Sequence, residues 1–295
     1  MTIFFKAGLA LLMAGAAADA QPFDPNSPAD AIKISRKIQC SLDDGKPMFF
    51  SWQGRAYARR PGHRDQHIFD VLGMNVRQCG TVTSEERGTG YRQVSREVML
   101  YLDPQTGEVL ETWDNPFTGE AVQVIHVQND PVNMRAPMFE TTRTGEPYRF
   151  PGKVVGDKVL WNIEVPLFYP NPLGGSYQTY VGNHYHAMEI FDFVMDRDAL
   201  LDPDMASADG TVVTWVRIAQ WLPWMQMGSR PGLMIINASG TKHERFDALP
   251  AQMRAQIREN YAAFDAPPPL DDDRPNETSW TVFKQRIDQA REAED

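Results

Sequence analysis

Two proline- and glycine-containing turns constrain the fold of this chain more than any other feature of its sequence. Residues 103–107 read Asp-Pro-Gln-Thr-Gly and residues 115–119 read Asn-Pro-Phe-Thr-Gly, so a Thr-Gly-Glu unit starts at Thr106 and again at Thr118. Proline presets φ for a turn, and glycine supplies the left-handed conformation that closes it. The runs at 93–102, 109–113 and 121–127 flank these turns, and this spacing predicts an antiparallel meander.

Short β-type runs continue through most of the chain. They lie at residues 48–53, 55–59, 66–76, 158–168, 177–195, 211–221 and 232–237. Helical patterns occur only near the ends, at residues 27–38, 251–264 and 279–292, the first with Ser27 as its cap and Pro28 in its first turn. We therefore expect a mainly β protein: an antiparallel, lipocalin-like (calycin) β-barrel with flanking N- and C-terminal helices, or alternatively a β-sandwich. Such a barrel leaves room for one small ligand.

The first twenty residues have the character of a secretory signal peptide. Lys6 precedes an apolar run that is too short to span a bilayer, and Ala18 and Ala20 supply the small residues that signal peptidase accepts. Cleavage at this position leaves residues 21–295 as a single domain, which we expect to be periplasmic. The two cysteines of the chain, Cys40 and Cys79, are both in this mature part, and an oxidising compartment favours a disulfide between them. A pair of buried free thiols is the alternative.

The net charge of −10 narrows the range of partners. There is no basic stripe to neutralise phosphates, so we expect no nucleic acid and no anionic membrane surface as a partner. No stretch of the mature chain has the ~18 apolar residues of a membrane span. The charge pattern does not predict an oligomeric state.

His184 and His186 are the first candidates for chemistry. In a β-strand they point to the same face, together with Tyr180. Histidine in a partly dry cavity suits acid–base catalysis, with Tyr180 as an assisting donor. If a metal is bound instead, His126 from another strand is the natural third ligand. The cupin pattern does not fit, because Glu189 alternates to the opposite face. The remaining alternative is that both histidines only satisfy hydrogen bonds inside a barrel.

A second candidate lies in residues 211–221, where Trp215, Arg217 and Trp221 alternate onto one face. An arginine flanked by tryptophans is suited to holding a carboxylate or phenolate, with the indole rings packing on an aromatic ligand. We list these residues, with His126, as candidate substrate-binding residues. The alternative is an outward arginine covered by aromatic rings. Glu97 also shares a strand face with apolar neighbours and would need a partner if that face were buried.

Two long stretches resemble a known family. They are Phe69-Asp-Val-Leu-Gly-Met-Asn-Val-Arg-Gln-Cys79 and Val94-Ser-Arg-Glu-Val-Met-Leu-Tyr-Leu-Asp-Pro-Gln-Thr-Gly-Glu-Val-Leu-Glu-Thr-Trp-Asp-Asn-Pro116. Both are similar to a bacterial family catalogued as a domain of unknown function, number 1838, and the similarity extends over most of the mature chain. The resemblance implies no activity and transfers no catalytic residues.

These observations lead to three functional hypotheses. The first is a periplasmic enzyme without a cofactor, a lyase or isomerase that uses His184 or His186 for proton transfer on a small aromatic or hydrophobic molecule, with Arg217 as the anchor for an anionic group. The second is a non-catalytic barrel that binds a lipid or an aromatic ligand. The third is a metal-dependent enzyme that uses His126, His184 and His186.

Overall fold

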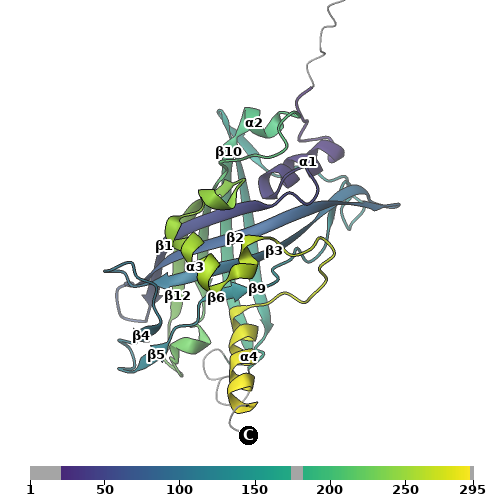
Figure 1. Ribbon diagram of the computed structural model, residues 1–295. Helices are drawn as coiled ribbons and strands as arrows, with labels where there is room; N and C mark the ends of the chain where they lie inside the picture. Colours follow the sequence, from purple (N-terminus) through teal and green to yellow (C-terminus); the bar gives the residue numbers. More distant parts are fainter. Residues whose placement is uncertain (1–20, 174–181, 293–295) are drawn as a thin grey trace, which may run out of the picture.

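In the computed structural model, most of the chain forms one large antiparallel sheet (Figure 1). The structure describes residues 21–173 and 182–292. The strands follow one another across the sheet in the order β6 (Val127–Asn129), β3 (Gly88–Leu102), β2 (Gln66–Ser84), β1 (Met48–Arg59), β12 (Leu233–His243), β11 (Val212–Ala219), β10 (His184–Asp196), β9 (Lys158–Pro170) and β8 (Lys153–Val155). A further short strand, β7 (Met138–Phe139), pairs with β3. The prediction of a mainly β, antiparallel protein is confirmed.

The sheet has two separate edges. Within the described residues, β6 and β7 at one end form no ladder with β8 at the other. The closed, lipocalin-like barrel that we expected is therefore not confirmed. The sheet is instead open and strongly curled, so that β3 and the β10–β11 pair face one another although β2, β1 and β12 lie between them. The charge of Arg217 on β11 acts to lower the pKa values of Glu97 and Tyr101 on β3, in agreement with this facing arrangement.

The predicted meander forms only in part. The turns are present: Gly107 and Gly119 both have positive φ, and their amides donate to the carbonyls of Asp103 and Asn115. However, β4 (Thr112–Asp114) and β5 (Ala121–Gln123) pair with each other in a separate two-stranded sheet. Trp113 is the reason, because it turns into the core, where its ring packs against those of Phe69 and other aromatic residues.

The helices cover different parts of the sheet. They are α1 (Pro28–Gln39), α2 (Arg197–Leu201), α3 (Ala251–Asn260) and α4 (Ser279–Glu292), with short 3-10 turns η2 (Pro223–Met225), η3 (Phe246–Ala248) and η4 (Ala262–Asp265). Three of the helices lie near the ends of the chain, as predicted. Among the described residues, no helix has the length and apolar character needed to cross a membrane.

Strand alternation separates an inner, concave face of the sheet from an outer face. On the outer face of β1–β3, Met253 and Ile257 of α3 pack against Leu72, Met74 and Leu100. On the inner face, α1 and α4 lie at opposite ends (Figure 1). Ile34 and Ile38 of α1 pack with Phe50 and Phe193, whereas Trp280 of α4 packs with Tyr185 and Ala187.

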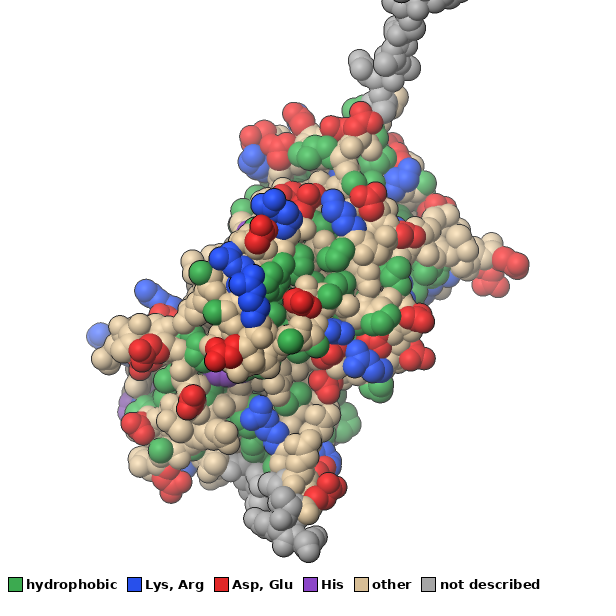
Figure 2. Space-filling view, in the orientation of Figure 1, with side chains coloured by type: hydrophobic (Ala, Val, Ile, Leu, Met, Phe, Trp, Pro, Cys, Tyr) green, Lys and Arg blue, Asp and Glu red, His purple; other side chains and the backbone are tan. Residues whose placement is uncertain are grey.

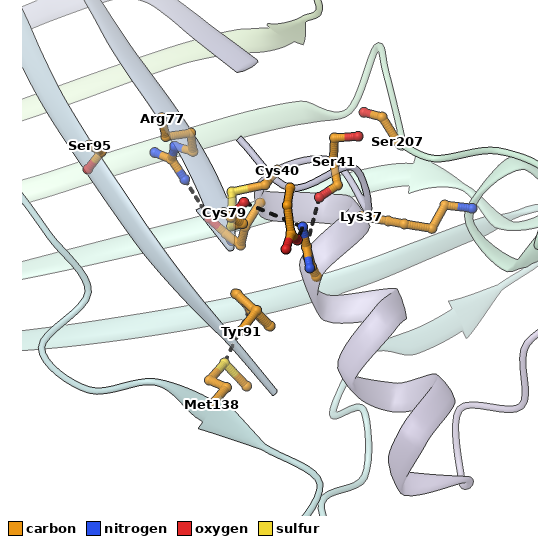
Figure 3. The surroundings of a disulfide bond; sticks show 12 residues. Lys37, Cys40, Ser41, Arg77, Cys79, Tyr91, Ser95, Met138 and Ser207 are labelled. Atoms are coloured by element: carbon orange, nitrogen blue, oxygen red, sulfur yellow. Dashed lines mark hydrogen bonds and ion pairs between the residues drawn. A yellow bond between two sulfur atoms is a disulfide. The ribbon is translucent and has the colours of Figure 1, made fainter. Parts of the chain in front are cut away.

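The predicted disulfide is confirmed, and it fastens α1 to the sheet. Cys40 at the end of α1 is bonded to Cys79 on β2, next to Tyr91 of β3 (Figure 3). Beside it, the buried Nζ of Lys242 on β12 donates to the carbonyl oxygens of Lys37 and Cys40, at 2.6 and 2.5 Å. These carbonyls lie at the C-terminal end of α1, where they have no donor within the helix, so Lys242, together with the Ala208 amide that donates to the Lys37 carbonyl, caps the helix.

Acidic and basic side chains are interspersed over the face seen in Figure 2, with apolar side chains between them. The basic side chains on this face do not gather into a stripe. The expected signal peptide, residues 1–20, lies outside the described residues.

Candidate functional site on the inner face of the sheet

The structure places His184 and His186 on the outer face of β10. Both side chains are exposed, and the ring of Phe168 on β9 stacks on His184 at a centroid distance of 4.9 Å. His186 meets the same ring edge-on at 5.8 Å. Tyr180, their expected partner, lies outside the described residues. Because alternate residues point to opposite faces, the inner face of β10 carries Tyr185 and Glu189 instead.

Arg217 forms the centre of the polar side chains on the inner face. Its Nη1 donates to Glu189 Oε1 at 2.8 Å, and its Nη2 donates to the Tyr185 hydroxyl at 2.8 Å. Glu189 and Arg217 are direct cross-strand partners in the antiparallel ladder. Solvent still reaches the pair, since the two side chains are 20% and 17% exposed. Burial alone would lower the pKa of Arg217, but Tyr185 and Glu189 raise it, so the guanidinium stays charged.

Glu97 approaches this ion pair from the opposite wall. Its Oε1 accepts a hydrogen bond of 2.7 Å from Asn129 Nδ2. Burial and the charge of Glu189 raise the pKa of Glu97, while Asn129 and Arg217 lower it only in part. We call Glu97, Glu189, Arg217, Tyr185 and Asn129 the inner cluster. Two carboxyl groups with different surroundings are an arrangement that allows one to hold a proton while the other is ionised.

Aromatic side chains adjoin the inner cluster. Trp215, two residues before Arg217, is stacked with Phe191 and meets Trp52 edge-on, at centroid distances of 6.3 and 6.0 Å. The indole nitrogens of Trp52 and Trp215 are buried and have no hydrogen-bond partner among the described residues. Buried donors without a partner are uncommon in proteins, and a ligand acceptor is one way to satisfy them. Asn129 likewise has an unpaired buried amide oxygen.

Gly73 makes room for one of these rings. The indole of Trp52 lies across Gly73 on the neighbouring strand, and a Cβ atom added there would come within 2.1 Å of the ring. Trp52 can therefore lie flat on the inner face only because residue 73 has no side chain.

The other predicted site residues lie elsewhere. His126 lies between β5 and β6, accepts a hydrogen bond from the Tyr101 amide at 3.1 Å and stacks on the Tyr101 ring. Burial and the charge of Arg286 lower its pKa to about 4, so it is neutral at neutral pH. Trp221 is buried in the core, where its indole donates to the Arg230 carbonyl. Of the expected binding residues, Trp215 and Arg217 belong to the inner cluster and its aromatic surroundings, whereas Trp221 does not.

The metal alternative is not supported by the positions of its ligands. The sheet separates the outward His184 and His186 from His126, which packs against the inner-face ring of Tyr101. In the part of the chain that the structure describes, no three His, Cys, Asp or Glu side chains gather in a way that could hold a metal ion.

The sequence contained a signal for the residues that were missed. Alternation along β10 places Glu189 on the other face from His184 and His186 and on the same face as Tyr185. On that face Glu189 is the cross-strand partner of Arg217. Asn129 and Trp52 carried no such signal, because their positions depend on how the sheet curls and on the absence of a side chain at Gly73.

Two hollows in the surface lie away from the inner cluster. One, of about 350 Å³, lies on the outer face beside the start of α3 and is lined by Ser51, Ser239 and Thr241 among others. His243 Nε2 lies within hydrogen-bond distance of both the Ser51 and Thr241 hydroxyls, at 3.0 and 3.1 Å. The other, of about 430 Å³, lies at the β1–β2 turn. The first hollow is also lined by Trp52 and the second by Arg59, Arg60 and Asp65. Among the described residues, neither combines charged groups with buried unpaired donors as the inner face does, and we therefore regard the inner face as the candidate site.

Comparison with known proteins assigns no activity to this site. The model of a family described as "Protein of unknown function (DUF1838)" matches residues 45–287. No curated protein matches the chain. Among solved structures, the attachment invasion locus protein Ail of Yersinia pestis is aligned over 68% of this chain and 100% of its own, with 4% sequence identity and a TM-score of 0.18, too low to support any argument.

Proposed function

Starting from the fact that the chain belongs to the DUF1838 family, whose description gives no activity, we propose that it binds a small aromatic or otherwise hydrophobic molecule with an anionic group at the inner cluster. In this proposal the ligand lies on the concave inner face of the open, curled sheet. Arg217 holds the anionic group, and the rings of Trp52, Trp215 and Phe191 pack on the apolar body.

A single observation carries the proposal: a partly exposed arginine–glutamate pair lies beside two buried indole donors that have no partner in the described part of the chain. A purely structural ion pair needs no such donors near it. A ligand carboxylate can accept from the indole nitrogens while it shares Arg217 with Glu189. Glu189 then acts as a competitor, because its own carboxylate occupies the guanidinium in the absence of ligand.

This competition gives a test in which two substitutions act in opposite directions. Dodecanoate and 1-naphthoate are titrated against dodecanol and 1-naphthalenemethanol by calorimetry. We expect the anions to bind at least tenfold more tightly than the matched alcohols.

Arg217→Met should remove this preference, whereas Glu189→Gln should strengthen anion binding because it frees the guanidinium. Arg55→Met, at an exposed arginine on the outer face, is the control and should change nothing. Equal affinity for acids and alcohols, or no binding of any probe, would refute the proposal.

Acid–base catalysis on the bound molecule is the second candidate, and the raised pKa of Glu97 favours it. A carboxyl group whose pKa is raised by its surroundings is suited to proton donation. In this proposal Glu97 takes the role that we first expected of the histidines, in a lyase or isomerase step. Turnover of a ligand identified by co-purification, lost in Glu97→Gln with binding retained, is the expected result. Unchanged turnover in that variant would exclude the role.

We also propose that the mature chain is secreted to the periplasm through residues 1–20. The Cys40–Cys79 disulfide supports an oxidising compartment. N-terminal sequencing of protein recovered from a periplasmic extract should begin at Gln21. Recovery of the uncleaved chain from the cytoplasm would contradict this location.

A further inference from the structure

The exposed apolar side chains of the molecule gather on one part of its surface. Six large apolar side chains are exposed in the described residues, and five of them lie on β8, β9 and β11: Val154, Val155, Phe168, Val212 and Ile218. Phe168 is the most exposed, at 68%. The sixth, Met205, lies in the loop after α2. Apolar patches of this kind mark interaction surfaces in water-soluble proteins more often than chance.

On the outer face of β9–β11, Ile218 lies in a band of apolar side chains, whereas Val154 pairs with Val159 and shares its face of the sheet. Met188 on β10 lies in register between Pro166 on β9 and Ile218 on β11. In the next row, Ile190 lies beside Val216. The side chains of Met188, Ile190 and Val216 are only partly buried and belong to none of the core clusters of the described residues.

The band has no cover within the described part of the chain. The helix α3 packs on the outer face of β1–β3, and α1 and α4 pack on the inner face. The short helix α2 continues from the end of β10 at Asp196 and contacts that strand there, whereas α1 and α4 reach β10 from the inner face. The outer face of β9–β11 is therefore a largely apolar sheet surface that is open to a partner.

The polar side chains at the two ends of this face indicate which partner fits, because an imidazole N–H can donate to a carboxylate. His184 and His186 lie at one end of the band, and Glu164 and Asp192 lie toward the other. Asp192 is held in place by the Asn162 amide and, at 3.1 Å, by the Thr214 hydroxyl. A two-fold rotation about an axis through the middle of the band exchanges the two ends, so the histidines of one copy lie over the carboxylates of another. Such a face is complementary to itself, whereas its carboxylates would repel an anionic lipid surface.

We propose that two copies of this chain pack face to face through the outer surface of β9–β11. The strands of the two copies run nearly aligned in this packing, as in sheet-on-sheet contacts, with the apolar band in the centre and the His–carboxylate contacts at both ends.

Sedimentation velocity of the mature chain between 1 and 100 µM tests the interface. We expect a dimer, and Met188→Asp or Ile218→Asp should each weaken dimerisation at least tenfold while the circular dichroism spectrum is retained. Met205→Asp is the matched control, because it places the same charge at an equally exposed apolar site away from the band. A monomeric wild-type chain at 100 µM, or an effect of Met205→Asp equal to that of Ile218→Asp, would overturn the proposal.

The charge complementarity has its own test. Asp192→Lys places a lysine over the partner copy's histidines, and His186→Glu places a glutamate over its aspartate, so each variant alone should be monomeric. When the two variants are mixed, both charge contacts become attractive and a heterodimer should form. Failure of the mixture to associate while the wild-type chain dimerises would exclude this two-fold arrangement.

Discussion

At the scale of single residues, the inner cluster depends on a carboxyl group that is costly to keep charged. Glu97 is half-buried, close to the charge of Glu189, and its only direct hydrogen-bond donor among the described side chains is Asn129. Groups in such surroundings are kept at functional sites at the expense of stability. Glu97 should therefore be a residue whose removal stabilises the fold and weakens its function.

Glu97→Gln tests this expectation through pH. Because folding raises the pKa of Glu97 above its ordinary value of 4.5, the folded state holds this proton more tightly than the unfolded state does. The free energy of unfolding of the wild type should then fall as pH rises from about 4.5 through the folded-state pKa. Glu97→Gln should lack this loss and be the more stable protein at pH 7, with the difference vanishing below pH 4.5. Urea unfolding between pH 4 and 8 measures it.

Glu85→Gln is the control for this experiment, because Glu85 is exposed in the turn between β2 and β3, away from both the inner cluster and the outer face of β9–β11. Its free energy of unfolding should stay within about 0.5 kcal/mol of wild type at every pH. A Glu97→Gln variant that is less stable than wild type at pH 7 would show that the carboxylate is a structural partner.

Strand β10 shows what the sequence could and could not predict about the positions of His184, His186 and Glu189. Alternation correctly separated Glu189 from His184 and His186. It could not tell which set faces inward, because the outer face of this strand, with Met188 and Ile190, is as apolar as an inner face. These apolar side chains belong to the exposed band on the outer face. The sequence therefore did not indicate which face of β10 points inward.

At the scale of secondary-structure elements, the pairing of β1 and β2 determines the shape of the inner face. The two strands approach closely at Trp52 and Gly73, and this contact lays an indole across the sheet next to Trp215. Helices α1 and α4 cover the two ends of the inner face, and its central part carries the aromatic rings and the inner cluster.

Gly73→Ala should disturb this arrangement directly. A methyl group at residue 73 collides with the Trp52 ring, so the ring must tilt or the strands must separate, at a cost of roughly 1–3 kcal/mol. Tryptophan fluorescence and near-ultraviolet circular dichroism should change along with urea stability. Gly80→Ala, on the same strand, meets only the flexible end of Leu270 and should leave the spectra unaltered. Identical behaviour of the two variants would contradict the close contact at Trp52.

Turns and helices were easier to predict than strand partners. The glycines of both turns and the pattern of α1 are local signals, and they appear where expected. The strands β4 and β5 left the predicted meander because Trp113 packs with residues distant in sequence, which a local pattern does not contain.

At the scale of the whole molecule, the N-terminal helix is tied to the sheet by both covalent and polar contacts. The disulfide joins it to β2, and the buried Lys242 joins it to β12. The prediction of an antiparallel β protein with end helices was confirmed because alternation and helix periodicity suffice for it. Closure into a barrel was not confirmed, because it depends on whether the two edge strands meet, and the sequence of either edge does not determine that.

Replacing Cys40 and Cys79 together by serine should lower the free energy of unfolding by about 3–4 kcal/mol, the value expected for closing a loop of this length. Dithiothreitol should lower the stability of the wild type by a similar amount and leave the double variant unchanged. Equal stability of the oxidised wild type and the double variant would show that Lys242 and the packing of α1 hold the helix without the disulfide.

The position of β1 in the sheet has a consequence for the order in which the protein acquires its structure. β1 is among the first strands to be synthesised, yet it lies in the middle of the sheet. One of the two ladder partners of Phe49 is His243 on β12, much later in the chain. Until β12 has been synthesised, one side of β1 remains without hydrogen bonds. Long-range pairing of this kind slows folding. The large sheet therefore cannot be completed before most of the chain has been translated, and the nascent chain stays open to chaperones until then.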